Sequence, residues 1–546
     1  MLPRMLTLRR RVATGLLPFA LAAAAGAPAV HAADLTARVD AAFASFGPAT
    51  PGCAVGVSTD GAIALTRGYG MADLERDVPI TPDSIFEAGS VSKQFTAAAV
   101  LMLARDGKLS IDDPVRRYVP ELPDYNVPLT IRHLLNHTSG LRDWGALEAV
   151  AGWPRTTRVN THAHVLEVVK RQRALNFTPG THWSYSNTGY NLAAIIVQRV
   201  SGQSLADFTR ARIFEPLAMT RTSWRDDHTR IVKGRAQAYE FVDGAFHLEM
   251  PFENVYGNGG LLTTVSDLLR WTAGLAAGRI GGAGFLAEME KAVSFSGDPT
   301  RGYGLGLMMD TRRGARQVDH SGSTAGYRAH LANYPEERVS VAVLCNGGNA
   351  GATARAYQVA DLFLAERTTL APAPEVKHTL TSEETARVEG LYRSTLSGAF
   401  VSFIHDKNGV RVEGGGPLLA QTATRFLTPG GQSWEFDGNG ARSADRYDVV
   451  TYVRVPPATP SATELAELVG EYASSEAGVT IGVAAEGDSL VITRAPDTRM
   501  RLRPVYKDAF ETPMLGVIVF RRDAALRVAG LSVSQERIWD LRFEKK

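Results

Sequence analysis

The chain is poor in the residues that build metal sites. It has only two cysteines, Cys53 and Cys345, and they lie far apart in the sequence. Zinc-binding cysteines usually come in pairs about two to four residues apart, so this spacing excludes the common structural zinc sites. The twelve histidines show no metal-ligand spacing either. We therefore expect no bound metal and no cofactor.

Beyond residue 32, the chain also lacks runs of charge of one sign. Its 59 lysines and arginines are balanced by 57 aspartates and glutamates, which gives a net charge of +2 at pH 7. The basic residues are scattered and are not interleaved with aromatic residues, so the pattern excludes a nucleic-acid-binding surface. A hydrophobic content of 45% is enough for one large core and one or two smaller domains.

The apolar stretch near the N-terminus is too short to span a membrane comfortably. It covers residues 12–25, follows the basic residues Arg4 and 9–11, and precedes the small-residue sequence Val30-His31-Ala32. This order is typical of a signal peptide, which we predict over residues 1–32. We expect an exported protein, periplasmic or secreted, with no stable membrane insertion. The sequence leaves the export route open.

No Gly-x-Ser-x-Gly sequence is present, which argues against a hydrolase with a nucleophile elbow. The chain contains instead Ser90 and Lys93, at the start of an Ala-, Val- and Leu-rich segment that predicts a buried helix. Residues three apart on a helix are neighbours, about 5–6 Å apart at Cβ, so the amine can reach the hydroxyl. A buried lysine is partly neutral and can act as the base that a serine nucleophile needs. By itself, such a pair is more often a helix cap followed by a surface lysine.

Two further motifs follow along the chain. Tyr185 and Asn187 precede an apolar helix, where a phenol can transfer protons and an amide can point the same way. His320 and Gly322 follow a strand-like segment, and the glycine would let a substrate backbone approach the strand edge closely. Taken singly, the first motif is consistent with an ordinary aromatic loop and the second with a turn histidine.

Taken together and in this order, the three motifs resemble those of a known family. Class C serine β-lactamases, penicillin-binding carboxypeptidases, D-aminopeptidases and β-lactamase-like esterases carry S-x-x-K, Y-x-N and K/H-x-G. The resemblance covers about residues 35–366 and includes three more segments, His133–Leu141, Gly259–Leu268 and Gly302–Gly306. It implies an α/β fold of the β-lactamase/transpeptidase type, in which an antiparallel sheet is flanked by helices.

The same resemblance implies roles for individual residues. Ser90 would attack an acyl carbon, while Lys93 and Tyr185 would share the role of base and then return the proton to the leaving group. The backbone N–H groups of Ser90 and Ser323 would bind the oxyanion. His320 would position Tyr185 or face the polar end of the substrate.

The remaining site residues bear on the substrate. Asn187 would bind the substrate amide, and Gly322 would leave room for the substrate backbone. His320 stands where β-lactamases usually carry the lysine of Lys-Thr-Gly, so a permanent cation is replaced by a group near neutral at pH 7. The H-x-G form is familiar among D-aminopeptidases and related peptidases and esterases. The change weakens the β-lactamase interpretation and leaves the catalytic chemistry intact.

The resemblance also bears on the two cysteines. In the family sheet the first and last strands are antiparallel neighbours. Cys53 opens one strand-like segment and Cys345 closes another, so the family fold would bring them close together. In an oxidising compartment they could form a disulfide, and the alternative is two buried thiols.

The composition changes after the expected catalytic domain, residues 33–368. Short alternating strands follow, broken by the Pro-rich segment Pro456–Pro460, and they predict two all-β domains over residues 385–455 and 462–546. The two halves repeat each other, since Gly390–Ser394 recurs 80 residues later. Each half is expected to form a small up-and-down barrel.

Three local elements of the catalytic domain are also readable. Apolar residues at helical spacing from Leu35 to Phe46 predict an amphipathic helix. The sequence Asp60-Gly61 between two alternating segments predicts a β-hairpin. A closing helix is expected from about Thr353 to Glu366.

A β-lactamase-like domain followed by two barrels is similar to the architecture of D-aminopeptidases. In that group a loop of the last barrel enters the active site and shapes it for a free amino terminus. This resemblance suggests that the segment Tyr506–Glu511 faces the cleft, where Asp508 or Glu511 would meet an ammonium. The alternative is a solvated hairpin tip.

Together these observations predict an exported serine hydrolase that cleaves amide or ester bonds through an acyl-enzyme. D-amino-acid peptides or amides are the favoured substrates, with a carboxylesterase or a class C β-lactamase as alternatives. A non-catalytic receptor for cell-wall peptides is a further alternative, but it has no need to retain the catalytic residues together. The expected partner is a small molecule or short peptide, and the sequence leaves a homo-oligomer open.

Overall fold

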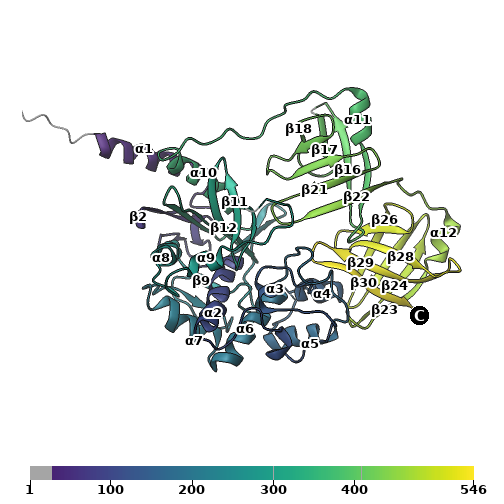
Figure 1. Ribbon diagram of the computed structural model, residues 1–546, viewed down its shortest axis with the longest axis horizontal. Coiled ribbons are helices and arrows are strands. Elements are labelled where there is room, and N and C mark those ends of the chain that lie inside the picture. The colour runs from purple at the N-terminus through teal and green to yellow at the C-terminus, as the bar shows by residue number, and fades with distance from the viewer. Residues whose placement is uncertain (1–26, 156, 299, 408) are drawn as a thin grey trace, which may run out of the picture.

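The computed structural model describes residues 27–546 except 156, 299 and 408. Figure 1 shows an α/β domain followed by two β-barrels, drawn in green and yellow. Among the described residues, no helix is long and apolar enough to cross a membrane. The basic and apolar parts of the predicted signal peptide, within residues 1–26, lie outside the described residues. The predicted cleavage sequence, residues 30–32, falls within helix α1 (Ala27–Ala42).

The α/β domain is built on a seven-stranded antiparallel sheet. Its first strand, β1, lies between β2 and the last strand, β14, so segments from both ends of the domain meet inside the sheet. This arrangement confirms the expected β-lactamase/transpeptidase-like fold. The strand order is β10 (Gly302–Tyr303), β11 (Met308–Arg312), β12 (Ala315–Thr324), β13 (Tyr327–Tyr334), β14 (Val339–Cys345), β1 (Cys53–Thr59) and β2 (Ala62–Tyr69).

The turn between β1 and β2 is the predicted hairpin. Asp60 and Gly61 have φ angles of 53° and 80°, so both residues are left-handed. Two left-handed residues make the turn that best matches the twist of paired strands, and Asp-Gly adopts it readily. The sequence signal was sufficient here because the conformation is decided by these two residues alone.

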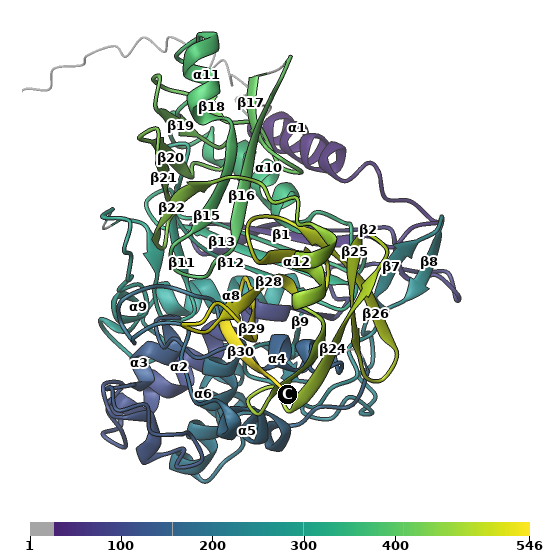
Figure 2. The same ribbon diagram turned by 90° about the vertical axis from the view of Figure 1, so that its right-hand side faces the viewer.

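Helices cover both faces of the sheet. On one face, α1 and α10 (Ala352–Leu364) lie side by side (Figure 2). Their side chains form a core with alternate residues of β1 and β14. On the other face, α8 (Val265–Ala276) packs against the same two strands. The predicted closing helix is confirmed, and the predicted first helix is present but ends at Ala42, before Phe43 and Phe46. Both faces of β1 are buried.

Shorter elements complete this domain. The helices α2 (Lys93–Arg105) and α6 (Asn187–Ser201) pack against each other in its interior. The other helical elements are η1 (Gly89–Ser92), η2 (Val115–Arg117), α3 (Ile131–Leu135), α4 (Trp144–Val150), α5 (His162–Arg171), α7 (Leu205–Thr209), η3 (Arg210–Phe214) and α9 (Phe285–Met289). The small strands are β3 (Met71–Asp73), β4 (Val78–Pro79), β5 (Phe86–Glu87), β6 (Ser223–Trp224), β7 (Tyr239–Val242), β8 (Ala245–Leu248) and β9 (Leu261–Thr263).

The first barrel is an eight-stranded sheet that nearly closes on itself. Arg411 of β17 forms a bridge with Pro417, two residues before β18, so the two ends of the sheet approach each other. Helix α11 (Ser382–Val388) precedes it. Its strands are β15 (Gly390–Ser394), β16 (Phe400–Asp406), β17 (Gly409–Val412), β18 (Leu419–Ala420), β19 (Arg425–Leu427), β20 (Ser433–Phe436), β21 (Gly440–Ala444) and β22 (Val449–Val455).

The second barrel is closed and repeats this plan. Helix α12 (Ala462–Glu467) precedes it, as α11 precedes the first. Its strands are β23 (Gly470–Ser474), β24 (Val479–Glu486), β25 (Ser489–Arg494), β26 (Thr498–Pro504), β27 (Ala509–Thr512), β28 (Gly516–Arg522), β29 (Val528–Gln535) and β30 (Ile538–Lys545). The tyrosine of the sequence repeat lies in the first strand of each barrel. Tyr392 donates a hydrogen bond to the Val388 carbonyl and Tyr472 to the Leu468 carbonyl, at 3.0 and 2.7 Å.

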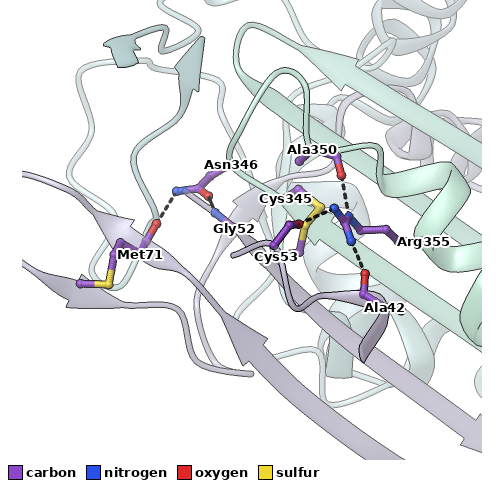
Figure 3. Close-up of a disulfide and its surroundings, with 9 residues drawn as sticks. Ala42, Gly52, Cys53, Met71, Cys345, Asn346, Ala350 and Arg355 are labelled. Carbon is purple, nitrogen blue, oxygen red and sulfur yellow. Dashed lines mark hydrogen bonds between the residues drawn. A yellow bond between two sulfur atoms is a disulfide. The ribbon is translucent and has the colours of Figure 1, made fainter. Parts of the chain in front are cut away.

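A disulfide joins the neighbouring strands β1 and β14. Cys53 and Cys345 are directly opposite each other in the strand register and are fully buried (Figure 3). The structure thus contains the disulfide and not two thiols. The next residue, Asn346, accepts a hydrogen bond from the Gly52 N–H at 2.8 Å and donates one to the Met71 carbonyl at 2.9 Å.

Arg355 of α10 fixes the same region from the helix side. Its guanidinium donates to the carbonyls of Ala350, at 2.8 Å, and of Ala42 at the end of α1 (Figure 3). The segment between β14 and α10 is therefore held at both ends. This matters for function because Gly348, Asn349 and Gly351 of that segment border the cleft described next.

Candidate active site

A cleft of about 1080 Å³ lies at the junction of the three parts. The predicted site residues Ser90, Tyr185, Asn187, His320, Gly322 and Ser323 all line it. The two barrels also reach it, the first through Asp445 and Tyr447 and the second through Glu536 and Arg537. The fold therefore brings together residues that the sequence separates by several hundred positions.

The hydroxyl and amine of the S-x-x-K motif are in contact. Ser90 lies in the tight turn η1, and Lys93 is the first residue of α2. Lys93 Nζ lies 3.1 Å from Ser90 Oγ, and it donates to Asn187 Oδ1 at 2.9 Å and to the Asn258 carbonyl at 2.6 Å. Burial, followed by the nearby charge of Arg537, holds the pKa of the Lys93 amine well below its usual value. Lys93 can therefore be neutral and accept a proton from Ser90.

Tyr185 faces the same pair. Lys93 Nζ lies 4.8 Å from the centre of its ring. Burial raises the pKa of the Tyr185 phenol, and the neighbouring Ser90 hydroxyl and the charge of Arg537 offset this only in part. The phenol is therefore protonated at neutral pH, so it enters the reaction as a proton donor and not as a base.

His320 is turned into the protein. Its Nδ1 lies 2.6 Å from the Ser321 carbonyl and its Nε2 lies 2.8 Å from the Tyr303 hydroxyl. Burial, and then the charge of Lys93, lowers the pKa of His320 to about 3, so the ring is neutral. A neutral imidazole donates from one nitrogen only, so Nδ1 donates to the carbonyl and Nε2 accepts from the tyrosine. Both nitrogens are thus occupied within the protein, and the site has no cation at the H-x-G position.

The glycine of this motif is required by close packing. A Cβ atom at Gly322 would lie 2.0 Å from the Ala88 carbonyl oxygen, and one at Gly89 would lie 2.6 Å from the Ser323 nitrogen. Strand β12 therefore runs directly against η1. This contact places the backbone N–H groups of Ser90 and Ser323 on neighbouring segments, which is the arrangement that an oxyanion hole needs.

His137 is a site residue that sequence reasoning did not single out. It is fully buried, and its ring centre lies 4.2 Å from that of Tyr185. Its Nδ1 accepts the backbone N–H of Ser186 at 3.2 Å, while burial and then Lys93 hold the pKa of His137 well below its usual value. It belongs to the segment His133–Leu141, which the sequence marked as family-like. Nothing in its spacing, however, connects it to a tyrosine 48 residues later.

The barrel loop expected at the cleft lies elsewhere. Tyr506 donates to the Gly398 carbonyl at 2.6 Å and packs between the two barrels, while Asp508 is paired with Arg522 at 2.9 Å. The expectation for Tyr506–Glu511 is wrong because this turn is used to join the barrels. The second barrel reaches the cleft through the turn between β29 and β30 instead.

Arg537 is the second residue of that two-residue turn. Its guanidinium carbon lies 4.8 Å from the centre of the Tyr185 ring. Its carbonyl accepts hydrogen bonds from the Asp143 N–H at 3.3 Å and from Asn176 Nδ2 at 3.2 Å, which fix the turn on the catalytic domain. Among the described residues, no group of three or more His, Cys, Asp or Glu side chains is arranged to hold a metal ion. The contacts among Ser90, Lys93 and Tyr185 are those of an acyl-transfer site.

Comparison with known proteins agrees with this geometry. A family model described as Beta-lactamase matches residues 39–364. The chain is 30% identical over 333 residues to a D-aminopeptidase of Gluconobacter oxydans, covering 60% of this chain and 62% of that one. It is 25% identical over 513 residues to a D-aminopeptidase of Brucella anthropi, covering 88% and 93%. A solved structure of a D-amino acid amidase from Ochrobactrum anthropi is 25% identical, with a TM-score of 0.52, and covers 61% of this chain and all of that one.

Proposed function

The chain belongs to the beta-lactamase family, and we propose that it is a serine hydrolase that cleaves D-amino-acid amides or short peptides through an acyl-enzyme on Ser90. The observation that carries this proposal is the buried Lys93 amine, with its lowered pKa, 3.1 Å from the Ser90 hydroxyl. The D-aminopeptidases among its relatives, one of them similar over nearly the whole chain, support the substrate class.

The reaction begins with proton transfer from Ser90 to neutral Lys93. The Ser90 oxygen attacks the acyl carbon, and the developing oxyanion is held by the N–H groups of Ser90 and Ser323. Tyr185 donates its phenolic proton to the leaving nitrogen and is reprotonated from Lys93, so the amine departs neutral and the acyl-enzyme remains. Water then hydrolyses the ester by the same steps in reverse. From the sequence, Lys93 and Tyr185 were expected to share the role of base. Because the phenol starts protonated, we assign the base to Lys93 and the acid to Tyr185.

Asn187 would orient the substrate. Its Oδ1 accepts a hydrogen bond from Lys93, which leaves its NH₂ group to donate to a substrate carbonyl. His320 and His137 would support Tyr185 without touching the substrate, because His320 binds Tyr303 and Ser321 and His137 binds the backbone of Ser186.

A free D-amino terminus carries a positive charge near the reacting bond. The cleft offers two carboxylates in place of the expected Asp508 and Glu511, namely Asp445 and Glu536. Asp445 Oδ1 accepts the N–H groups of Tyr447 and Asp448 at 2.7 and 2.9 Å, so its carboxylate is fixed in place. Glu536 is 82% exposed. We assign the ammonium to Asp445 because a fixed carboxylate loses less entropy on binding.

The setting of the reaction is also a proposal. The signal-like N-terminus supports export to the periplasm or outside the cell, and the buried disulfide is the kind found in oxidising compartments. The expected partner is a small or short-peptide substrate. A homo-oligomer stays a prediction.

The test is hydrolysis by the purified protein of D-alanine p-nitroanilide beside its L-isomer, p-nitrophenyl acetate and nitrocefin. Selective turnover of the D-anilide is expected, and Ser90→Ala serves as the control. Turnover of the acetate alone would make the protein an esterase, and turnover of nitrocefin alone a β-lactamase. A lack of turnover on all four would favour the receptor.

A further inference from the structure

We propose that the turn between β21 and β22 of the first barrel, residues Asp445–Asp448, positions the catalytic tyrosine. The inference rests on the proposed function, because it takes Tyr185 to be the proton donor of the reaction. In this proposal Tyr447 and Asp448 are positioning residues. They act on Tyr185 through its neighbours His182 and Trp183, and they are not themselves reacting groups.

Tyr447 supports the segment through its ring. It stacks on Trp183, with ring centres 4.0 Å apart and planes 14° from parallel. Trp183 in turn has its ring centre 6.2 Å from that of Tyr185. Offset stacking of this kind fixes the relative position of two large side chains. The barrel thus contacts the catalytic segment two residues before its tyrosine.

Asp448 supports the same segment through its backbone. Its Oδ2 accepts the Trp183 N–H at 3.1 Å and lies 3.0 Å from His182 Nδ1. The carboxylate is almost fully buried, and burial raises the pKa of Asp448, although the bonds to the Trp183 and Val449 N–H groups oppose this. A buried carboxylate with such partners holds its geometry, since any movement would leave it unpaired.

His137 of the catalytic domain binds the residues on either side of Tyr185. The Ser184 N–H donates to the His137 carbonyl at 3.0 Å, and the Ser186 N–H donates to the His137 ring at 3.2 Å. Tyr185 therefore lies between two anchored positions, with residue 183 bound to the first barrel and residues 184 and 186 bound to the catalytic domain. In this proposal, loss of the barrel anchor lets the tyrosine move relative to Ser90.

The turn is itself rigidly seated on the catalytic domain. The Tyr447 carbonyl accepts the Phe295 N–H at 2.8 Å, and the Arg446 carbonyl accepts the Ser294 hydroxyl at 3.1 Å. The Arg446 guanidinium lies 3.1 Å from Asp310 Oδ2 on β11. These contacts fix the turn against β11 and against the segment between α9 and β10. The first barrel can therefore transmit a fixed position to Trp183.

The experiment compares Tyr447→Ala with Tyr447→Phe, which keeps the ring, and with Tyr452→Ala as the matched control. Tyr452 is an aromatic residue of the same barrel that packs on Trp434 of the barrel itself, with ring centres 5.2 Å apart. Each variant is measured for kcat and KM on D-alanine p-nitroanilide, for the rate at which a fluorophosphonate probe labels Ser90, and for thermal unfolding. The labelling rate does not depend on the amide substrate.

Because a misplacement of about 1 Å can cost about a hundredfold in rate, we expect Tyr447→Ala to lower kcat at least about tenfold, with a much smaller change in KM. Tyr447→Phe should restore kcat, and Asp448→Asn should show the same split between kcat and KM as Tyr447→Ala. A Tyr447→Ala protein with wild-type kcat and labelling rate overturns the proposal. An equal loss in Tyr452→Ala would also overturn it, because the loss would then come from the barrel as a whole.

Failure of the proposed function would look different. If the wild-type protein is labelled at Ser90 but hydrolyses no D-amino-acid amide, the substrate assignment fails. The labelling rates of the variants still decide whether the turn positions the site. A wild-type protein that is neither labelled nor active overturns both proposals.

Discussion

The two barrels share one plan but contact the Tyr185 segment in different ways. Both present the turn between their seventh and eighth strands, and each turn carries an acid followed by an arginine, Asp445-Arg446 in the first barrel and Glu536-Arg537 in the second. The first turn packs behind Trp183, whereas the second lays Arg537 over the Tyr185 ring. Equivalent turns of two repeated barrels can thus have different roles, because each turn contacts a different part of the catalytic domain.

The arginines show the difference most clearly. Arg446 lies 3.1 Å from Asp310 of the sheet, so its charge is already matched. Arg537 lies 3.7 Å from the exposed Glu536 and shares the cleft with the catalytic groups. Its charge contributes to the low pKa of Lys93, second to burial. Arg446 thus helps to hold the turn on the sheet, whereas Arg537 lowers the pKa of Lys93.

The largest loss of activity is expected when the nucleophile Ser90 is removed. Ser90→Ala leaves both turns in place but removes the oxygen that forms the acyl-enzyme. We expect kcat to fall about 10⁴-fold or more, as in other nucleophile deletions. Steady-state hydrolysis of D-alanine p-nitroanilide measures it. Near-normal activity of Ser90→Ala would show that Ser90 is not the nucleophile.

The next largest effect is a shift of the pH profile, which we expect for Arg537 and not for Arg446. Arg537→Ala removes a cation near Lys93 and so raises the pKa of the amine. Since Lys93 acts in its neutral form, the acid limb of the kcat/KM profile should move to higher pH. A shift of one unit would lower activity on that limb about tenfold. Arg537→Lys should keep the limb in place.

Arg446→Ala is the matched variant in the first barrel. It can lower the rate by loosening the turn, but it should leave the acid limb where it is, because Arg446 is not among the charges that act on Lys93. Equal shifts in the two variants would mean that the equivalent turns have equivalent roles.

A smaller effect, on KM, is expected to differ between Asp445 and Glu536. Asp445→Asn removes the carboxylate assigned to the substrate ammonium, and hydrogen bonds to charged groups contribute about 1.5–3 kcal/mol. We expect KM for D-alanine p-nitroanilide to rise about tenfold, with little change for an ester that has no amino group. Glu536→Gln should change KM far less. The reverse order would move the ammonium to the second barrel.

The smallest effect on activity is expected at the segment between β14 and α10, which borders the cleft and lies next to the disulfide and not next to a barrel. Cys53→Ala with Cys345→Ala should leave kcat unchanged at 25 °C, because Asn346 and Arg355 still hold the segment. Stability should fall by about 2–4 kcal/mol, the typical contribution of a disulfide. Thermal unfolding and kinetics on the same samples test this. A large loss of kcat would show that the disulfide shapes the site directly.

Much of the site could be predicted because its three motifs are local patterns with a fixed order. Ser90 and Lys93 are neighbours on one helical turn, and the contact of Gly322 with η1 requires a residue without a side chain. The hairpin at Asp60-Gly61 and the repeated barrels also follow from short segments. In each case the signal that predicts the feature lies in one short segment of the sequence.

The rest depends on how distant surfaces meet. Asp508 carries the right charge for an ammonium, but it pairs with Arg522 inside its own barrel. His320 was expected near neutrality, and burial lowers its pKa further while Tyr303 occupies its second nitrogen. The stack of Tyr447 on Trp183 joins residues 264 positions apart by docking of a barrel. No periodicity or spacing along the chain records such contacts.

The burial of Lys93 also has a thermodynamic consequence. The unfolded chain binds a proton at this amine up to its ordinary pKa, whereas the folded chain releases it at a lower pH. Between those two values the unfolded state holds more protons, so the free energy of unfolding rises with pH. At neutral pH the lysine therefore weakens the fold that contains it. Lys93→Met should abolish activity and raise the midpoint of thermal unfolding, which would make this residue a point where selection has kept reactivity at the expense of stability.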